Sequence, residues 1–194
     1  MLQIVLIRPG STDYDLQQRI QGTLDIPLNE QGVAEVAQLI AELQDKGIET
    51  IYGPACQPAE QTAHALAHGL RVKVKKLDRM QNLDHGLWQG MLVEDVRLKQ
   101  PKVYRQWQEQ PETVCPPEGE RVGSAQERVR VCMTKLLKRH KEGVIGLVVP
   151  EPLASLVRQF VLQDELGNLW KVAEGRHRWE ILAVEPEKVL QHSG

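Results

Sequence analysis

Residues 2–12 read Leu2-Gln3-Ile4-Val5-Leu6-Ile7-Arg8-Pro9-Gly10-Ser11-Thr12. A short apolar run that ends at turn-forming residues is typical of a strand buried on both faces of a parallel sheet. Arg8 follows this run directly, so the sequence predicts a cation at the carboxyl edge of a central strand. Ligands of open α/β folds bind at that edge.

The spacing of apolar residues and the positions of turn-forming residues predict the remaining strands and helices. A second continuous apolar run at 144–149 indicates another buried strand. Alternating strands and helices predict a three-layer α/β/α sandwich with a mostly parallel central sheet. We expect one domain over 1–194, with an irregular insertion at about 85–120 above the carboxyl edge. Further strands are expected at 48–52, 72–74 and 179–184, and helices at 30–46, 59–68, 124–140 and 153–162.

Composition narrows the class of protein. The 194 residues are 41% apolar with a net charge of -2, which is typical of a globular chain and offers no basic footprint for nucleic acid. The lysine- and arginine-rich stretches at 71–76 and 135–141 are interpreted as a solvated strand edge and a helix C-terminus. No apolar stretch predicts a membrane span or a signal peptide, and three cysteines favour a reducing cytoplasm. A homodimer is compatible with the sequence.

The segment after the first strand carries a family resemblance. Arg8-Pro9-Gly10 is followed by Arg19-x-Gln21-Gly22 and by Asp25-Ile26-Pro27-Leu28-Asn29-Glu30-x-Gly32. This succession resembles the histidine phosphatase (phosphoglycerate mutase-like) superfamily, whose members read Arg-His-Gly at the first position and use the histidine to take the phosphoryl group. The resemblance implies a phosphoglycerate mutase-like fold. Pro9 stands where the family has its nucleophile, and proline has no atom that can attack phosphorus.

Three other positions of the family site also differ here. Pro58 stands where the resemblance implies a second phosphate-binding arginine, and Asn82 stands where it implies an acid/base carboxylate. Glu151, in Val148-Val149-Pro150-Glu151-Pro152, replaces the second histidine. Arg8 and Arg19 are left as candidate remnants of anion binding.

Charge arithmetic decides what we expect of Arg8. A carboxylate about 4 Å from a cation interacts with it by roughly 4 kcal/mol at an effective dielectric of 20, which could cancel its attraction for phosphate. Glu151 follows the neighbouring strand, so the sequence predicts an ion pair between Arg8 and Glu151, or failing that with Asp15.

The expectation from these losses is a catalytically inactive pseudoenzyme that binds or scaffolds an unknown protein or small molecule, without a cofactor. The alternative is an active phosphatase or mutase with a rebuilt site, in which His85 is a relocated base or nucleophile. A third hypothesis is a binding module for an uncharged or cationic ligand, favoured by Asp15 and Glu151.

Other reactive side chains are interpreted as structural. Cys115 and Arg121 match the Cys-x5-Arg pattern of tyrosine phosphatases, but prolines and acidic residues between them disfavour a phosphate-binding loop. His64 and His68 share a helix face without a third metal ligand. Cys132 is expected to pack, and Cys56 has no base nearby in sequence.

Overall fold

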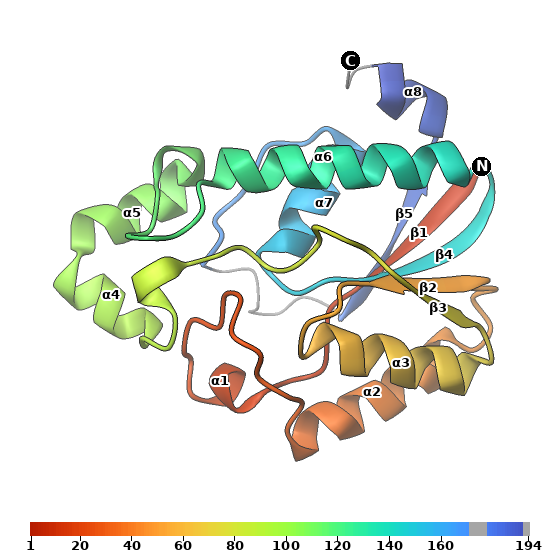
Figure 1. The fold of residues 1–194 in the computed structure, drawn as a ribbon, viewed down its shortest axis with the longest axis horizontal. Coiled ribbons are helices and arrows are strands. Elements are labelled where there is room, and N and C mark those ends of the chain that lie inside the picture. The colour runs from red at the N-terminus through yellow and green to blue at the C-terminus, as the bar shows by residue number, and fades with distance from the viewer. Residues whose placement is uncertain (171–177, 192–194) are drawn as a thin grey trace.

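The computed structural model describes residues 1–170 and 178–191 of the chain (Figure 1). Within these residues, five strands form one sheet in the order β3-β2-β4-β1-β5. β5 runs antiparallel to β1 and the other pairs are parallel. The mostly parallel sheet that the sequence predicts is thereby confirmed. The strands are β1 (Leu2–Ile7), β2 (Thr50–Gly53), β3 (Lys73–Lys76), β4 (Gly143–Val148) and β5 (Trp179–Val184).

β1 is an interior strand, between β4 and β5, and both of its faces are apolar. Ile4 and Leu6 enter a core beneath helices α6 (Val122–Arg139) and α7 (Leu153–Leu162). Val5 and Ile7 enter a second core beneath α2 (Glu30–Leu43) and α3 (Ala59–Leu70). Successive side chains of a strand point to opposite faces, so an unbroken apolar run supplies two cores at once. Figure 1 shows the resulting three layers.

Some helices begin at a cap or a proline that the sequence shows. The Asn29 side chain accepts a hydrogen bond from the Gly32 N–H and starts α2. α7 matches the predicted 153–162, and α6 begins two residues before its expected start. Outside 85–120, two short helices were not predicted, namely α1 (Asp13–Leu16) and α8 (Pro186–Gln191). A capping box between Thr12 and Asp15 begins α1.

The segment 85–120 is more regular than we expected. It contains the helices α4 (Val93–Lys99) and α5 (Pro101–Glu109), besides the single turns η1 (Gly86–Trp88) and η2 (Pro111–Thr113). Pro101 occupies the first turn of α5, where its missing N–H costs nothing. Trp107 of α5 is buried against Trp88 and Trp170. The expectation of an irregular insertion was wrong because it overlooked the amphipathic pattern of α5, whose Trp107 packs in an aromatic cluster.

The topology brings distant segments to one edge of the sheet. β1 and β4 are parallel and neighbouring, so the turns after Ile7 and Val148 emerge together. β5 is antiparallel, so its first residue, Trp179, pairs with Ile7 at the same edge. In the described residues no helix has the length and apolar character needed to cross a membrane.

Candidate functional site

A cavity of about 510 Å³ opens at the carboxyl edge of the sheet. The turns after β1, β2 and β4 line it together with α1 and the loop before β5, and Trp170 and Leu169 form part of its apolar wall. All the positions singled out from the family resemblance lie in its lining, namely Arg8, Pro9, Arg19, Pro58, Asn82 and Glu151, and so do Asp15 and His85.

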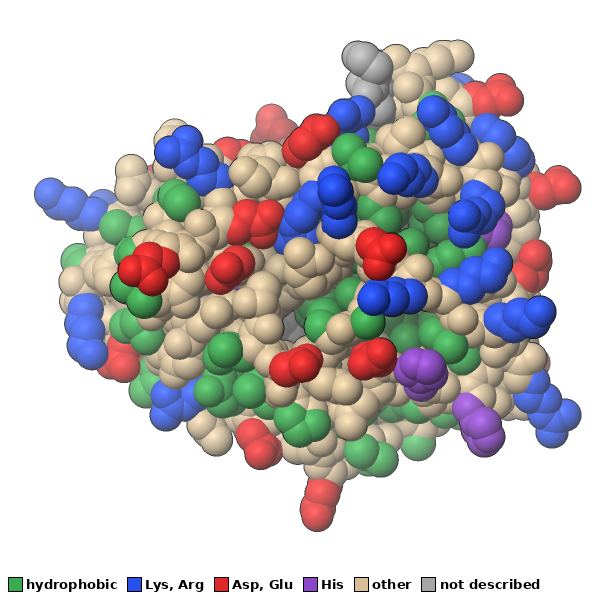
Figure 2. Space-filling view, in the orientation of Figure 1, with side chains coloured by type: hydrophobic (Ala, Val, Ile, Leu, Met, Phe, Trp, Pro, Cys, Tyr) green, Lys and Arg blue, Asp and Glu red, His purple; other side chains and the backbone are tan. Residues whose placement is uncertain are grey.

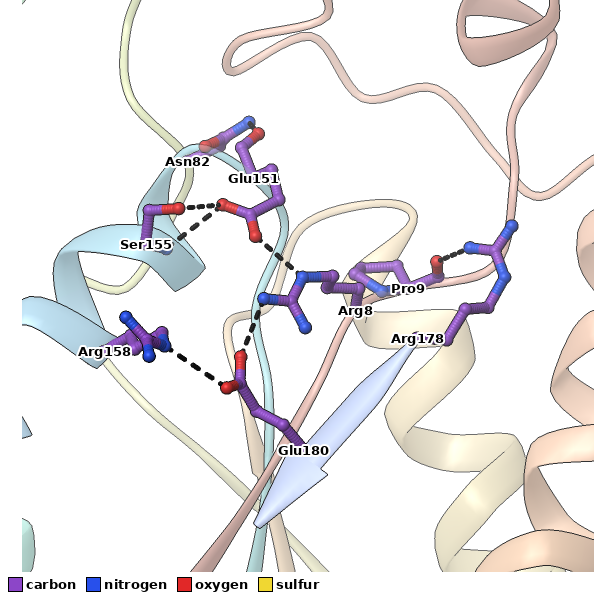
Figure 3. A network of polar contacts seen from close by, with 8 residues as sticks. All are labelled: Arg8, Pro9, Asn82, Glu151, Ser155, Arg158, Arg178 and Glu180. Atoms are coloured by element: carbon purple, nitrogen blue, oxygen red, sulfur yellow. Dashed lines mark hydrogen bonds and ion pairs between the residues drawn. The ribbon is translucent and has the colours of Figure 1, made fainter. Parts of the chain in front are cut away.

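Arg8 forms ion pairs with two carboxylates at the pocket (Figure 3). Its Nε donates to Glu151 Oε1 at 2.7 Å, and its Nη2 donates to Glu180 Oε1 at 2.9 Å. Burial alone would lower the pKa of Arg8, but the charges and hydrogen bonds of both carboxylates raise it above its usual range. The predicted Arg8–Glu151 ion pair is confirmed, and Glu180 is a second partner that sequence reasoning missed.

Glu151 is held as firmly as the arginine it contacts. Its Oε2 accepts hydrogen bonds from the Ser155 N–H at 3.1 Å and from the Ser155 hydroxyl at 2.9 Å. Its carbonyl oxygen accepts from the Asn82 side-chain amide at 2.8 Å. Asn82 therefore fixes the turn that carries Glu151 (Figure 3). Asp15 instead accepts from the Thr12 N–H and hydroxyl, as the cap of α1.

A second arginine holds the turn after β1. Arg178 donates to the Pro9 carbonyl and to Ser11 Oγ, both at 2.8 Å, and pairs with Glu35 of α2. Burial would raise the pKa of the Glu35 carboxyl, but hydrogen bonds from Ser11 and Gln31 and the charge of Arg178 hold it below its usual range. Neither Arg178 nor Glu35 belonged to the predicted site, because only the tertiary fold brings them to Pro9.

Arg19 differs from the other two pocket arginines in its partners. Its Nη1 donates to the Gly90 carbonyl at 2.7 Å and its Nε to the Gln17 side-chain oxygen at 2.8 Å. Among the residues that the structure describes, no carboxylate pairs with Arg19. The exposed lysines and arginines that Figure 2 shows over β3 and the C-terminal part of α6 do not line the pocket. Arg19 is therefore the lining cation whose charge is least neutralised.

His85 is buried beside the pocket, with 5% of its surface exposed. Its Nδ1 lies 3.1 Å from the Leu83 carbonyl oxygen, and its ring lies 5.5 Å from that of Trp107. Burial is the main reason why the pKa of His85 falls to about 4. The imidazole is therefore neutral at pH 7.

The remaining candidates lie elsewhere. Cys115 is exposed, and its thiol contacts the Pro116 and Gly119 carbonyls rather than the pocket. Cys132 is buried within α6, as expected. His64 and His68 are exposed on α3. Within residues 1–170 and 178–191, no cluster of three histidine, cysteine or acidic side chains could hold a metal ion.

The chain is similar in sequence and in fold to known phosphatases. The family model of the histidine phosphatase superfamily (branch 1) matches residues 4–192. Phosphoserine phosphatase 1 of Hydrogenobacter thermophilus is 28% identical over 188 residues, covering 97% of this chain and 89% of the relative. Bacillus stearothermophilus YhfR shares the fold with a TM-score of 0.82 at 22% identity, over 96% of this chain and 97% of that one. A mycobacterial glucosyl-3-phosphoglycerate phosphatase with VO3 has a TM-score of 0.83 at 23% identity, over 93% and 90%.

These findings correct one expectation. The sequence analysis predicted that the chain is not an enzyme, whereas a relative aligned over 97% of the chain is named as a phosphatase. The prediction failed because it judged the missing side chains position by position. It gave little weight to His85 and Arg19, and it did not consider Arg178, which the fold brings to the same pocket.

Proposed function

The chain belongs to the histidine phosphatase superfamily, and on that premise we propose that it hydrolyses phosphomonoesters in the pocket at the carboxyl edge of the sheet. In this proposal the site is rebuilt. Pro9 cannot attack phosphorus, and the nucleophile is His85 in the loop before η1.

The observation that carries the proposal is the state of the His85 imidazole. A carbonyl oxygen only accepts hydrogen bonds, so the contact with Leu83 assigns the proton to Nδ1 and leaves a lone pair on Nε2. Among the described residues, Nε2 makes no hydrogen bond. A neutral imidazole with an unoccupied Nε2 is the form that can attack phosphorus, and the pKa of about 4 maintains it at neutral pH.

The reaction would proceed in two displacements. The Nε2–phosphorus bond forms as the ester P–O bond breaks, and the leaving alkoxide takes a proton from water. The resulting hydroxide then attacks the phosphorus, the N–P bond breaks, and inorganic phosphate leaves with the imidazole neutral again. Such transfer depends mainly on positioning and on cations that stabilise the phosphoryl oxygens.

Arg19 is the cation best placed by charge for this role, since its described partners are uncharged oxygens. Arg178 and Arg8 are both paired with carboxylates. Because only part of the positive charge is available to phosphate, we expect a slow enzyme, with kcat/KM below the roughly 10⁴–10⁸ M⁻¹s⁻¹ that is usual for enzymes.

The cavity volume favours a small substrate, because 510 Å³ lies toward the lower end of the range for small-molecule sites. O-phosphoserine is the first candidate, since a relative that spans nearly the whole chain is named phosphoserine phosphatase 1. The mechanism needs no cofactor. We place the enzyme in the cytoplasm, because a reducing compartment keeps thiols unpaired. Cys56, Cys115 and Cys132 are all free in the structure.

The test measures phosphate release from O-phosphoserine and from p-nitrophenyl phosphate by the full chain. We expect the wild type to exceed the buffer rate and His85→Gln to lose at least about 100-fold, because the attacking nitrogen is gone. His68→Gln is the matched control, since that histidine is exposed on α3. Mass spectrometry of a quenched reaction should find an acid-labile phosphoryl group on His85.

Two outcomes would overturn the proposal. One is a wild-type rate equal to that of buffer. The other is hydrolysis that persists undiminished in a His85→Gln protein whose circular dichroism shows that it is folded. A wild-type rate equal to that of buffer would mean that the pocket does not hydrolyse these phosphomonoesters.

A further inference from the structure

Glu180 lies close to the pocket without lining it. It is the second residue of β5 and pairs with Leu6 in the antiparallel register. That register places its side chain near the end of β1, where Arg8 emerges. Glu180 is the charged residue of an otherwise apolar strand, Trp179–Val184, and the local sequence does not reveal which cation it meets.

Among the described residues, Arg8 contacts two carboxylates that differ in how firmly they are held (Figure 3). Glu151 is fixed by both the N–H and the hydroxyl of Ser155. Glu180 has no such anchor among the described residues, and 31% of its side chain is exposed. Of these two carboxylates, Glu180 is therefore the less firmly held.

Glu180 is also shared between two arginines. Its Oε1 contacts Arg8 Nη2 at 2.9 Å, and its Oε2 contacts Arg158 Nε at 3.3 Å. Arg158 belongs to α7 and also pairs with Asp164 at 3.3 Å. Arg158 therefore draws part of the negative charge of Glu180 away from Arg8, and its own charge is in turn moderated by Asp164.

From this arrangement we infer that Glu180 is a positioning residue that sets the affinity of the pocket for the phosphate group of its ligand. It reduces the charge that Arg8 presents to an anion, and Arg158 opposes this effect by competing for the same carboxylate. The inference rests on the proposed function in that it takes a phosphate group as the ligand. It does not require that the ligand be hydrolysed.

The inference predicts that substitutions of Glu180 and of Arg158 shift the affinity for phosphate in opposite directions. A purely structural role of the two residues would not give opposite shifts. Glu180→Gln removes a negative charge beside Arg8 and should tighten the binding of inorganic phosphate by at least about fivefold, since nearby charges interact strongly at partly buried sites. Arg158→Gln leaves Glu180 to Arg8 alone and should weaken binding by about threefold. Loss of packing or order would weaken binding in both variants.

The experiment is isothermal titration calorimetry of the full chain with inorganic phosphate at pH 7.5 and low salt. Glu94→Gln is the matched control, because it breaks an exposed glutamate–arginine pair on α4 and should leave the affinity unchanged. Circular dichroism verifies that each variant is folded. Opposite shifts for Glu180→Gln and Arg158→Gln support the inference.

The inference is overturned if Glu180→Gln binds phosphate no more tightly than the wild type, or if none of the proteins binds phosphate. It is equally overturned if Arg158→Gln binds more tightly. Opposite shifts in a protein without phosphatase activity would leave this inference standing while the proposed hydrolysis fails, so the two failures can be told apart.

Discussion

Arg8 carries a full positive charge into a site where 8% of the residue is exposed. An unpaired charge in such a place is strongly unfavourable, so the chain supplies Glu151 and Glu180 as partners. The same pairing lowers the attraction of Arg8 for a phosphate. The ion pairs that satisfy the buried guanidinium of Arg8 therefore reduce its affinity for an anion.

His85 makes the stability of the fold depend on pH. Burial lowers the pKa of His85 from 6.5 to about 4, so between these values the unfolded chain binds more protons at this site than the folded one. The stabilisation is fully present above about pH 6.5 and is lost as the pH falls toward 4. We predict that His85 accounts for about 2 kcal/mol of the unfolding free energy lost between pH 7 and pH 5.

Urea unfolding at these two pH values measures the effect. His85→Gln should lose about 2 kcal/mol less than the wild type over this interval, because glutamine does not titrate. His68→Gln should follow the wild type, since that histidine is exposed. Parallel losses in the wild type and in His85→Gln would contradict the prediction.

Helix α5 combines an amphipathic pattern of its own with tertiary aromatic contacts. α5 buries Trp107, whose ring lies 5.8 Å from Trp88 and 5.9 Å from Trp170. Trp170 in turn stacks on Tyr104 with ring centroids 5.0 Å apart. This aromatic cluster also contacts His85, so the helix that completes it helps to form the wall of the pocket.

We predict that Trp107→Ala destabilises the protein by about 3–5 kcal/mol, because it empties a fully buried site between aromatic rings. Urea unfolding gives the value. Leu98→Ala on α4 is the control, since Leu98 is 65% exposed, and it should change the unfolding free energy by less than about 0.5 kcal/mol. A small effect of Trp107→Ala would mean that α5 is not held by this cluster.

In the whole molecule, two apolar cores share one sheet. The core under α6 and α7 and the core under α2 and α3 both take residues from β1 and β4. Neither core can be exposed without disrupting strands that the other needs. This arrangement suits one cooperative unit, and the single domain expected from the sequence stays a prediction.

We therefore predict one unfolding transition, with the same midpoint by tryptophan fluorescence and by far-ultraviolet circular dichroism. Leu66→Ala in α3 and Leu136→Ala in α6 remove buried side chains from opposite faces of the sheet. Each should cost about 2–5 kcal/mol and shift both signals together. If Leu66→Ala separated the two midpoints, the chain would contain two units that unfold independently.

Most of the fold was predictable because its signals are local. The apolar run 2–7, the cap at Asn29 and the spacing of α7 each report on neighbours within one strand or helix. The ion pair of Arg8 with Glu151 was also within reach, since both follow apolar runs that become adjacent parallel strands. The helices of 85–120 were not predicted, although α5 is amphipathic, because the aromatic cluster that its Trp107 enters forms only in the tertiary structure.

The amino-acid sequence by itself determined the layers of this protein, the burial of β1 on both faces and the absence of a nucleophilic side chain at Pro9. Only the tertiary structure decided which charges meet around the pocket. Glu180 contacts Arg8 across 172 positions of sequence, and Arg178 contacts Pro9 across 169. Periodicity describes neighbours along the chain, whereas such contacts depend on the direction of β5 and its register against β1. A one-residue shift of that register would turn the Glu180 side chain to the other face of the sheet. The contact between Glu180 and Arg8 therefore cannot be read from the local sequence.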